Sequence, residues 1–433
     1  MKVIIVGGGI AGLAVAIGLR RAGHTVKVFE RSTFSREVGA AINVCPNASR
    51  ILLNWGFDPH KSRLVTAQEQ KVMVGKTLKT VVKLDCSQFS EIYGSAFFFA
   101  HRVDLHSELL RLATQSENPV EVVLDSEVKS YDPNGSVTLM DGSIHAADLI
   151  VAADGVHSIA AKIIDDGSPA IPTGQSAFRF LIPTEVIREN PSAASLLEDG
   201  VMKILTGTDE RRLVWYPCAN GTIQNFVGIH PSINQGKKED WDLTATTSDV
   251  VAQYKDFHPT ILSIIRKATS IKRWPLLYRE PMPRWAKGRL VLVGDAAHPM
   301  LPHQGQGGAQ AIEDAGALYT IFNGLVGQIT YQDISDRLKI FETVRINRAS
   351  AIQVFSNAGQ DEAERVYERA KPFMATGQHI PTTPAEYIEH NFGYDVIKEA
   401  EAWCHRYAKA GSLMEQRPDW IDAASDSWNI NKE

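Results

Sequence analysis

The sequence predicts an α/β fold that is interrupted by a β-rich block and followed by helices. Three observations lead to this prediction. Residues 2–30 read as a strand, a glycine-rich turn, a helix and a second strand. Residues 164–288 contain several short segments in which apolar and polar side chains alternate, as in a sheet with one buried face. A further apolar run begins at Leu290 and leads into an acid, prolines and glycines.

The composition is that of an ordinary globular protein. The chain has 433 residues, of which 44% are hydrophobic, and its formal net charge is -5. Because there is no basic excess, we expect no nucleic-acid partner. The four cysteines lie far apart without a C-x-x-C pair, and the histidines lack ligand spacing, so we expect neither a disulfide scaffold nor a metal site. A reducing, cytoplasmic compartment fits this cysteine usage.

The uncharged stretch from Val3 to Leu19 could pass for a signal peptide or a short membrane anchor. It contains five glycines, which weaken an uninterrupted helix. We therefore expect neither secretion nor a membrane span.

The first thirty residues contain a dinucleotide-binding fingerprint in its expected setting. Gly7 allows a tight turn, Gly9 lets the backbone approach a pyrophosphate, and Gly12 lets helix and strand pack closely. Glu30 follows the second strand, where a carboxylate can accept the hydroxyls of an adenosine ribose. The predicted elements are a strand at Lys2–Val6, the G-x-G-x-x-G turn at residues 7–12, a helix at Leu13–Ala22 and a strand at Thr25–Phe29.

Three later positions are candidates for contacts with the same ligand. Ala41 ends a predicted close-approach loop at residues 39–41. Arg102 directly precedes a predicted helix with Asp104 as its N-cap, and it is a candidate for a phosphate contact, although a solvated arginine fits equally well. Residues 148–158 read as a buried strand that ends in Asp154, a second acid at a strand end.

The block after Ile163 has the pattern of one sheet with a few helices, and residues 71–92 also read as strands. Residues 330–433 are predicted to be mostly helical, with a loop at residues 376–384. The predicted strands of the block are Phe178–Ile182, Met202–Leu205, Arg211–Tyr216, Ile223–Ile229 and Lys272–Tyr278, and its predicted helices are residues 248–257 and 260–268.

The segment from Leu290 to Asp314 combines several features of a ligand site. A short buried strand leads to Asp295, and Pro299 and Pro302 then exclude a helix. Gly305, Gly307 and Gly308 leave the next helix start without side chains. Free backbone N–H groups and the helix dipole would face a polar, electron-rich ligand there.

Three signatures now stand in order: VGGGIAGLAVA with Glu30, AADGVHS, and GDAAHPMLPHQGQGGAQAIEDA. Together they resemble the single-component FAD-dependent aromatic monooxygenases of the p-hydroxybenzoate and salicylate hydroxylase type, and especially salicylate-hydroxylase-like members of fungal secondary metabolism. The resemblance implies a glutathione-reductase-type FAD-binding Rossmann domain with an inserted β-sheet substrate domain. It places the FAD domain at residues 1–163 and 289–350, the substrate domain at 164–288, and a C-terminal helical region at 351–433. Residues 68–100 could hold a small β-rich part of the substrate region.

The resemblance also assigns the FAD contacts, and one position departs from the family pattern. An arginine usually follows the aspartate of the AADG signature by seven residues, but Ala161 stands there, followed by Lys162. Lysine lacks the bidentate fork of arginine, so the choice between NADPH and NADH stays open. The carried-over cofactor residues are Gly7, Gly9, Gly12, Glu30, Ala41, Arg102, Asp154, Asp295, Gly307 and Gly308.

The implied activity is hydroxylation of an electron-rich, phenolic small molecule. NADPH or NADH would reduce FAD, and O₂ would then form a flavin C4a-hydroperoxide that the aromatic ring attacks. Arg179 and Tyr216 are carried over as residues that hold the phenolate, and His303 could polarise a substrate hydroxyl. His298 is expected to hold the shape of the flavin loop instead.

The orientation of Arg179 depends on its neighbours. It alternates with Phe178 and Phe180, so it faces a cleft or solvent if the two phenylalanines pack in the core, and faces away from a pocket if they line one.

Two other readings stay open. One is a flavin epoxidase or oxidative cyclase that acts on a non-phenolic natural product, and the other is a non-catalytic FAD-binding module. The scattered cysteines exclude a dithiol reductase, and no W-x-W-x-I-P motif of flavin halogenases is present. We expect a monomer or homodimer.

Overall fold

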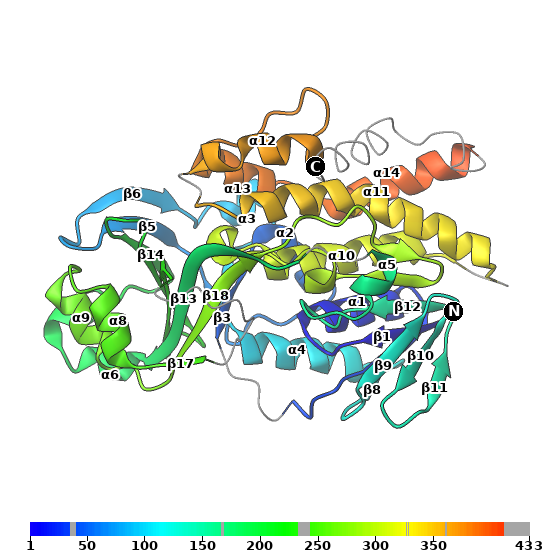
Figure 1. Ribbon diagram of the computed structural model, residues 1–433, viewed down its shortest axis with the longest axis horizontal. Helices are drawn as coiled ribbons and strands as arrows, with labels where there is room; N and C mark the ends of the chain where they lie inside the picture. The colour runs from blue at the N-terminus through cyan, green and yellow to red at the C-terminus, as the bar shows by residue number, and fades with distance from the viewer. Residues whose placement is uncertain are drawn as a thin grey trace.

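The computed structural model describes residues 1–34, 40–165, 169–232, 243–325, 327, 329–359 and 362–410. Two large sheets lie on opposite sides of the molecule, and the C-terminal helices run along a third side (Figure 1). The predicted Gly39–Ala41 loop is described only at Ala40 and Ala41, because Gly39 lies outside the described residues.

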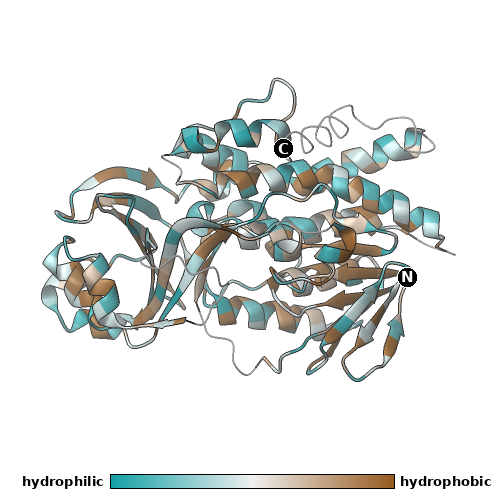
Figure 2. Ribbon diagram, viewed as in Figure 1, coloured by the Kyte–Doolittle hydropathy of each residue, from teal (hydrophilic) through white to brown (hydrophobic). Residues whose placement is uncertain are grey.

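The first large sheet is built from segments that are far apart in the sequence. Its order is β19(Ala286–Lys287), β20(Leu290–Leu292), β12(Leu149–Ala152), β1(Lys2–Val6), β2(Thr25–Phe29) and β8(Glu121–Val123). All neighbours pair in parallel except β19 with β20. Strands β20 and β12 are apolar throughout and β1 is apolar after Lys2, and this sheet is largely brown in Figure 2, which is typical of a parallel sheet buried on both faces.

Helices α1(Ile10–Arg21), α4(Arg102–Thr114) and α10(Gly307–Phe322) pack around this sheet. Helix α1 contacts both α4 and α10. Gly18 makes the approach of α1 to α10 possible, because a Cβ there would lie 3.1 Å from the carbonyl oxygen of Ala315. The glycine turn after β1 and the glycine start of α10 are therefore held in one rigid layer.

The second large sheet has eight strands and collects the predicted β-rich block. Its order is β17(Leu243–Ala245), β18(Ile271–Tyr278), β13(Ile171–Pro183), β16(Ile223–Pro231), β15(Arg212–Cys218), β14(Val201–Thr206), β5(Glu69–Val74) and β6(Thr80–Asp85). Thus residues 69–85 join this sheet, although more than eighty residues separate them from β13. The boundaries of the two domains themselves remain a prediction.

One face of the eight-stranded sheet is covered by short helices. Phe178, Phe180, Trp215 and Phe226 point to this face and are buried in one apolar cluster with residues of the covering helices. The helices are α6(Thr184–Arg188), α7(Pro191–Ala194), α8(Thr247–Gln253) and α9(Pro259–Ile265). The other face is turned toward the remainder of the molecule.

Two three-stranded sheets complete the β structure. The first consists of β3(Ala41–Val44), β7(Phe98–His101) and β4(Val65–Thr66), and the second of β11(Ile144–Ala146), β10(Ser136–Leu139) and β9(Val128–Asp132). Helices α2(Pro46–Asn54), α3(Phe89–Tyr93) and α5(Ala161–Ile164) lie in the same half of the chain.

The C-terminal part is helical, as predicted, and contacts α10. Thr330 and Thr383 each form a capping box, which begins α11 and α13 at those positions. Its elements are α11(Tyr331–Phe355), η3(Ala363–Arg365), α12(Tyr367–Ala370), η4(Lys371–Phe373), α13(Pro384–Phe392) and α14(Val396–Ala410). Among all the described helices, none is both long enough and apolar enough to cross a membrane.

Three local predictions were wrong. Asp104 is not the N-cap of α4, because the helix begins at Arg102 and His101 is the N-cap; Asp104 instead pairs with Arg63 at 2.8 Å. The end of the predicted strand region at residues 71–92 is helix α3. The proline loop is not free of helix, because the short 3₁₀ helix η2(Pro302–Gln304) tolerates a proline at its first position; another 3₁₀ helix, η1(Gly294–Ala296), lies just before the loop.

Candidate active site

Three acids stand at the carboxyl ends of neighbouring parallel strands. Asp295 follows β20, Asp154 follows β12, and Glu30 follows β2, while the glycine turn follows β1 between them. Since parallel strands end at the same edge of a sheet, this edge presents an acid, a second acid, a glycine turn and a third acid in that spatial order.

The glycine turn has the three roles expected of its three glycines. Gly7 adopts φ +103°, and a Cβ there would lie 2.3 Å from the carbonyl oxygen of Ala153. A Cβ on Gly12 would lie 1.9 Å from the carbonyl oxygen of Gly7. By contrast, a Cβ on Gly9 would meet nothing within 4 Å, so the space in front of this N-cap is open to a ligand.

Glu30 is bound to the turn by its own carboxylate. Its Oε2 accepts the backbone N–H of Gly8 at 2.6 Å, and its Oε1 accepts the N–H of Ser32 at 2.7 Å. These bonds fix the carboxylate beside the glycine turn, where the predicted ribose contact requires it.

Asp154 is held by a residue that the sequence did not single out. The hydroxyl of Tyr131, on β9, donates to Oδ2 of Asp154 at 2.8 Å. Burial raises the pKa of Asp154, although the bonds from Ser158 and Tyr131 act in the opposite direction. Burial and the neighbouring Asp154 also raise the pKa of Tyr131, so this phenol remains a donor.

Asp295 is solvent-accessible although it lies deep in the molecule. More than a third of the residue is exposed, yet burial by surrounding atoms raises the pKa of its carboxyl, while His298 and Arg102 act to lower it. A residue can meet both conditions if it faces an internal space that solvent reaches. Arg102 begins α4, and its N–H donates to the carbonyl of Ala40 at 2.8 Å.

The start of α10 is shaped by glycines, as expected. Its N-cap, Gln306, makes no side-chain capping bond, so the first N–H groups of the helix are left for a ligand. A Cβ on Gly308 would lie 2.8 Å from Cδ1 of Ile42 on β3, whereas Gly307 is open to about 4.0 Å, where Cβ of Met300 lies. Strand β3 and the α10 start therefore face each other closely.

The inner face of the eight-stranded sheet brings Arg179, Tyr216 and Asn225 together. Because Phe178 and Phe180 are in the core on the other face, Arg179 points inward, and its Nη2 lies 3.5 Å from the carbonyl oxygen of Ala41. The guanidinium also lies over the ring of Trp274, 5.1 Å from its centroid. Burial lowers the pKa of Arg179, and Tyr216 opposes this shift.

Asn225 is a second residue that sequence reasoning missed. It is directly opposite Tyr216 in the β15–β16 pairing, and its Oδ1 accepts the N–H of Ala41 at 3.2 Å. Both backbone polar groups of Ala41 are thus contacted from the eight-stranded sheet. Tyr216 is buried against Phe99 at a ring distance of 5.0 Å, and burial raises the pKa of Tyr216 although Arg179 opposes the shift.

An apolar wall surrounds the inward-facing arginine. Leu301, which directly precedes η2, packs with Ala177, Val227, Ile229, Trp274 and Leu276 of the sheet. His303 is half-buried within η2, two residues after Leu301, so the proline loop contacts the inner face of the sheet, as Ala41 and Phe99 also do.

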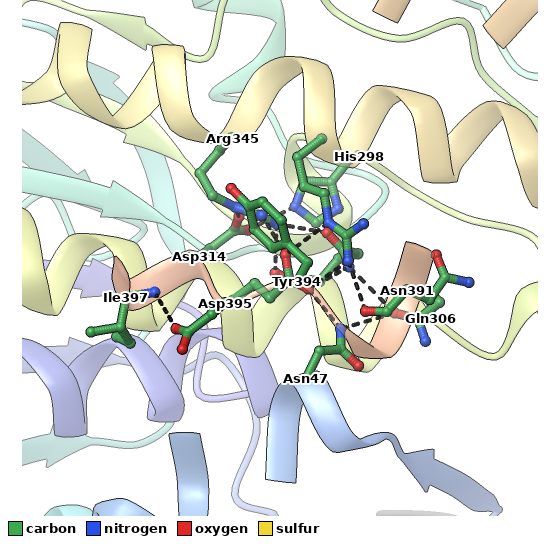
Figure 3. A network of polar contacts seen from close by, with 12 residues as sticks. Asn47, His298, Gln306, Asp314, Arg345, Asn391, Tyr394, Asp395 and Ile397 are labelled. Atoms are coloured by element: carbon green, nitrogen blue, oxygen red, sulfur yellow. Dashed lines mark hydrogen bonds and ion pairs between the residues drawn. The ribbon is translucent and has the colours of Figure 1, made fainter. Parts of the chain in front are cut away.

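A buried charge network supports α10 from behind (Figure 3). Arg345 of α11 donates to Glu313 at 2.5 Å and to Asp314 at 2.8 Å, and all three side chains are fully buried. Asn47 of α2 donates to Glu313 at 2.6 Å. Arg348 also reaches Glu313 and donates to the carbonyls of His390 and Asn391, which ties the C-terminal helices to α10.

The residues present fit FAD. The uncapped starts of α1 and α10 offer N–H groups at two places, the open side of Gly9 admits a pyrophosphate, and Asp295 and Glu30 lie at the two ends of the acid-lined edge. A ligand with two phosphates between two polyols matches this spacing of donors and acceptors.

The fold and this edge define the protein as an FAD-binding oxidoreductase. A model of the FAD binding domain family matches residues 1–352, so the chain belongs to that family. Its relatives show that it is an FAD-dependent monooxygenase of the aromatic hydroxylase type.

Two relatives and one solved structure illustrate the match. The FAD-dependent monooxygenase cfoG of Aspergillus candidus is 39% identical over 420 residues, which span 94% of this chain and 96% of the relative. The 3-hydroxybenzoate 6-hydroxylase 1 of Aquipseudomonas alcaligenes is 31% identical over 367 residues, 83% of this chain and 89% of the relative. A salicylate hydroxylase substrate complex shares the fold, with a TM-score of 0.72, 24% identity, and coverage of 93% of this chain and 98% of that one.

Proposed function

We propose that the protein uses NADPH or NADH and O₂ to hydroxylate a phenolic aromatic small molecule. The substrate would lie between the proline loop and the inner face of the eight-stranded sheet. The names of two similar proteins, a hydroxybenzoate hydroxylase and a salicylate hydroxylase, support a hydroxylated aromatic acid or phenol as the kind of substrate.

The observation that carries this proposal is the environment of Arg179. Its guanidinium is inward-facing and pairs with no carboxylate among the described residues, while Trp274 and the apolar wall surround it. A buried cation without an acid costs free energy unless an anion joins it. A phenolate or an aromatic carboxylate supplies both the anion and a flat ring that can pack on the wall.

Bound along the edge that carries Glu30, the glycine turn and Asp295, FAD would supply the redox chemistry, namely acceptance of a hydride and activation of O₂. The chain's own residues hold and polarise the substrate. Arg179 stabilises the phenolate, which makes the ring electron-rich, and the hydroxyl of Tyr216 donates a hydrogen bond to the phenolate oxygen. His303 accepts or returns the phenolic proton, and the apolar wall excludes water from the reacting atoms.

The nicotinamide would bind only transiently. Asp154, held by Tyr131, is at the edge where the resemblance places a contact shared by FAD and NAD(P)H. Ala161 stands in place of the usual arginine, and the lysine that follows it, Lys162, is exposed on α5, which supports weaker phosphate recognition.

The test is oxidation of NADPH and of NADH by the purified yellow protein in the presence of phenols and aromatic acids. The proposal expects a substrate that accelerates NAD(P)H oxidation and gains one atom of labelled oxygen from O₂. A product oxygenated at an isolated double bond would indicate an epoxidase instead. Acceleration by none of a broad phenol panel would refute the proposed substrate class.

A further inference from the structure

The turn that carries Asp295 is held at both ends by one buried carboxylate. Oδ2 of Asp314 accepts the N–H of Gly294 at 2.8 Å and contacts Nε2 of His298 at 2.7 Å. Asp295 lies between Gly294 and His298 in the sequence, so the two bonds close a loop around it. Asp314 belongs to α10, the helix whose start faces strand β3.

The hydrogen bond between His298 and Asp314 has a defined donor and acceptor. An ionised carboxylate only accepts, so Nε2 of His298 carries the proton and donates it to Asp314. Nδ1 of the same ring is buried and has no partner among the described residues.

The second oxygen of Asp314 is also fixed. Oδ1 accepts Nε of Arg345 at 2.8 Å, and Arg345 is further bound to Glu313 at 2.5 Å. His298, Asp314 and Arg345 converge in Figure 3. Because both oxygens are engaged, the carboxylate cannot rotate away from the turn without breaking buried bonds.

A third contact fixes the turn from the opposite side. Gly294 has φ +59°, and a Cβ there would lie 2.8 Å from Cβ of Ala11 on α1. The turn is thus placed between α1, which begins at the pyrophosphate turn, and α10, which begins at the other end of the cofactor edge.

We propose that His298 and Asp314 are positioning residues for FAD. They fix the turn of Asp295 to α10, so that the acid and the bare helix start hold the cofactor at one separation. This role concerns retention of the cofactor and does not depend on the identity of the aromatic substrate.

The test compares release of FAD from three holoenzyme variants by the recovery of flavin fluorescence on dilution. His298→Leu removes the donor and should raise the FAD dissociation constant about tenfold or more, the effect of roughly 1.4 kcal/mol. His298→Gln keeps an N–H at a similar distance from the backbone and should restore the constant to within about threefold of the parent.

The matched control is His24→Leu. His24 is also buried and its Nε2 donates to the carbonyl of Phe322 at 3.0 Å, at the opposite end of the same helix α10. This variant should lose stability comparably but release FAD as slowly as the parent. Equal loss of FAD in His24→Leu, parent-like retention in His298→Leu, or failure of His298→Gln to restore retention would each overturn the proposal.

Asp314→Asn provides an independent variant if His298→Leu does not fold. It preserves the shape of the side chain but weakens both acceptors, so faster FAD release is expected. Parent-like release from Asp314→Asn would also refute the role.

Discussion

Two separate alanine substitutions in the glycine turn should have different effects. Gly12→Ala should lower stability, and Gly9→Ala should lower the affinity for FAD. In a helix, alanine is favoured over glycine by roughly 0.8–1 kcal/mol. At Gly12 the new methyl group would lie 1.9 Å from the carbonyl oxygen of Gly7, which is backbone and cannot move aside. Overpacking costs about 1–3 kcal/mol, and a clash this close with backbone belongs at the upper end, so after the helix gain Gly12→Ala should destabilise the FAD-free protein by about 2 kcal/mol net.

The Gly9→Ala variant should keep its stability but bind FAD more weakly. Its φ of -73° suits alanine, and the added methyl group would meet no atom within 4 Å in the FAD-free protein. The unfolding midpoint should therefore stay near that of the parent, because the difference between these residues at an N-cap is less than about 1 kcal/mol. The same methyl group would occupy the space that the pyrophosphate needs, and FAD affinity should fall roughly ten- to hundredfold.

The two measurements are thermal unfolding of the FAD-free proteins by circular dichroism and FAD titration by fluorescence quenching. The reasoning is refuted if Gly9→Ala binds FAD as tightly as the parent, because the pyrophosphate then does not approach this residue. It is also refuted if FAD-free Gly12→Ala melts with the parent.

Three further predictions follow from the site. Arg179→Met should keep the protein yellow but reduce substrate-stimulated NAD(P)H oxidation about ten- to hundredfold, since a charged hydrogen bond contributes about 1.5–3 kcal/mol. The rate is measured by stopped-flow or absorbance, and unchanged stimulation would exclude Arg179 from the site. Asn225→Leu removes the acceptor of the Ala41 N–H and should raise the fraction of reducing equivalents released as hydrogen peroxide, measured with a peroxidase-coupled assay against a Gln88→Leu surface control. Asp154→Asn should stabilise the FAD-free protein at pH 7, because burial raises the pKa of Asp154 in the folded state. The charged carboxylate therefore lowers the free energy of unfolding. This loss is absent below about pH 4 and complete above the raised pKa. The gain in unfolding midpoint should therefore shrink as the pH falls toward 4, and a constant difference across this range would contradict the assignment.

The sequence was informative wherever structure depends on local pattern. The strand, glycine turn and helix of residues 2–21 were predicted because alternation, glycine spacing and helix length are all read within twenty residues. The inward direction of Arg179 was predicted only as one of two outcomes, since alternation shows that it opposes Phe178 but not which face is covered. Helices α8 and α9 decide this, and their position is a tertiary property.

The missed residues depend on pairings across long stretches of chain. Tyr131 reaches Asp154 from a different sheet, and Asn225 reaches Ala41 across 184 positions. Tyrosine and asparagine on strands are common, and neither lies in a recognisable motif. The parallel pairing of β5 with β14 was likewise out of reach, because strand order in a mixed sheet is set by the connections that pack around it.

The interleaved order of the six-stranded sheet has a consequence for synthesis of the protein. Strands β1 and β12 lie side by side, but β20, which completes the edge, is 138 positions beyond β12 in the chain, and the arginine behind α10 comes later still. During translation, β12 therefore remains an unpaired strand edge until residue 292 has left the ribosome. The charge network behind α10 is incomplete before Arg345 emerges, so we expect the flavin site to be completed late in synthesis.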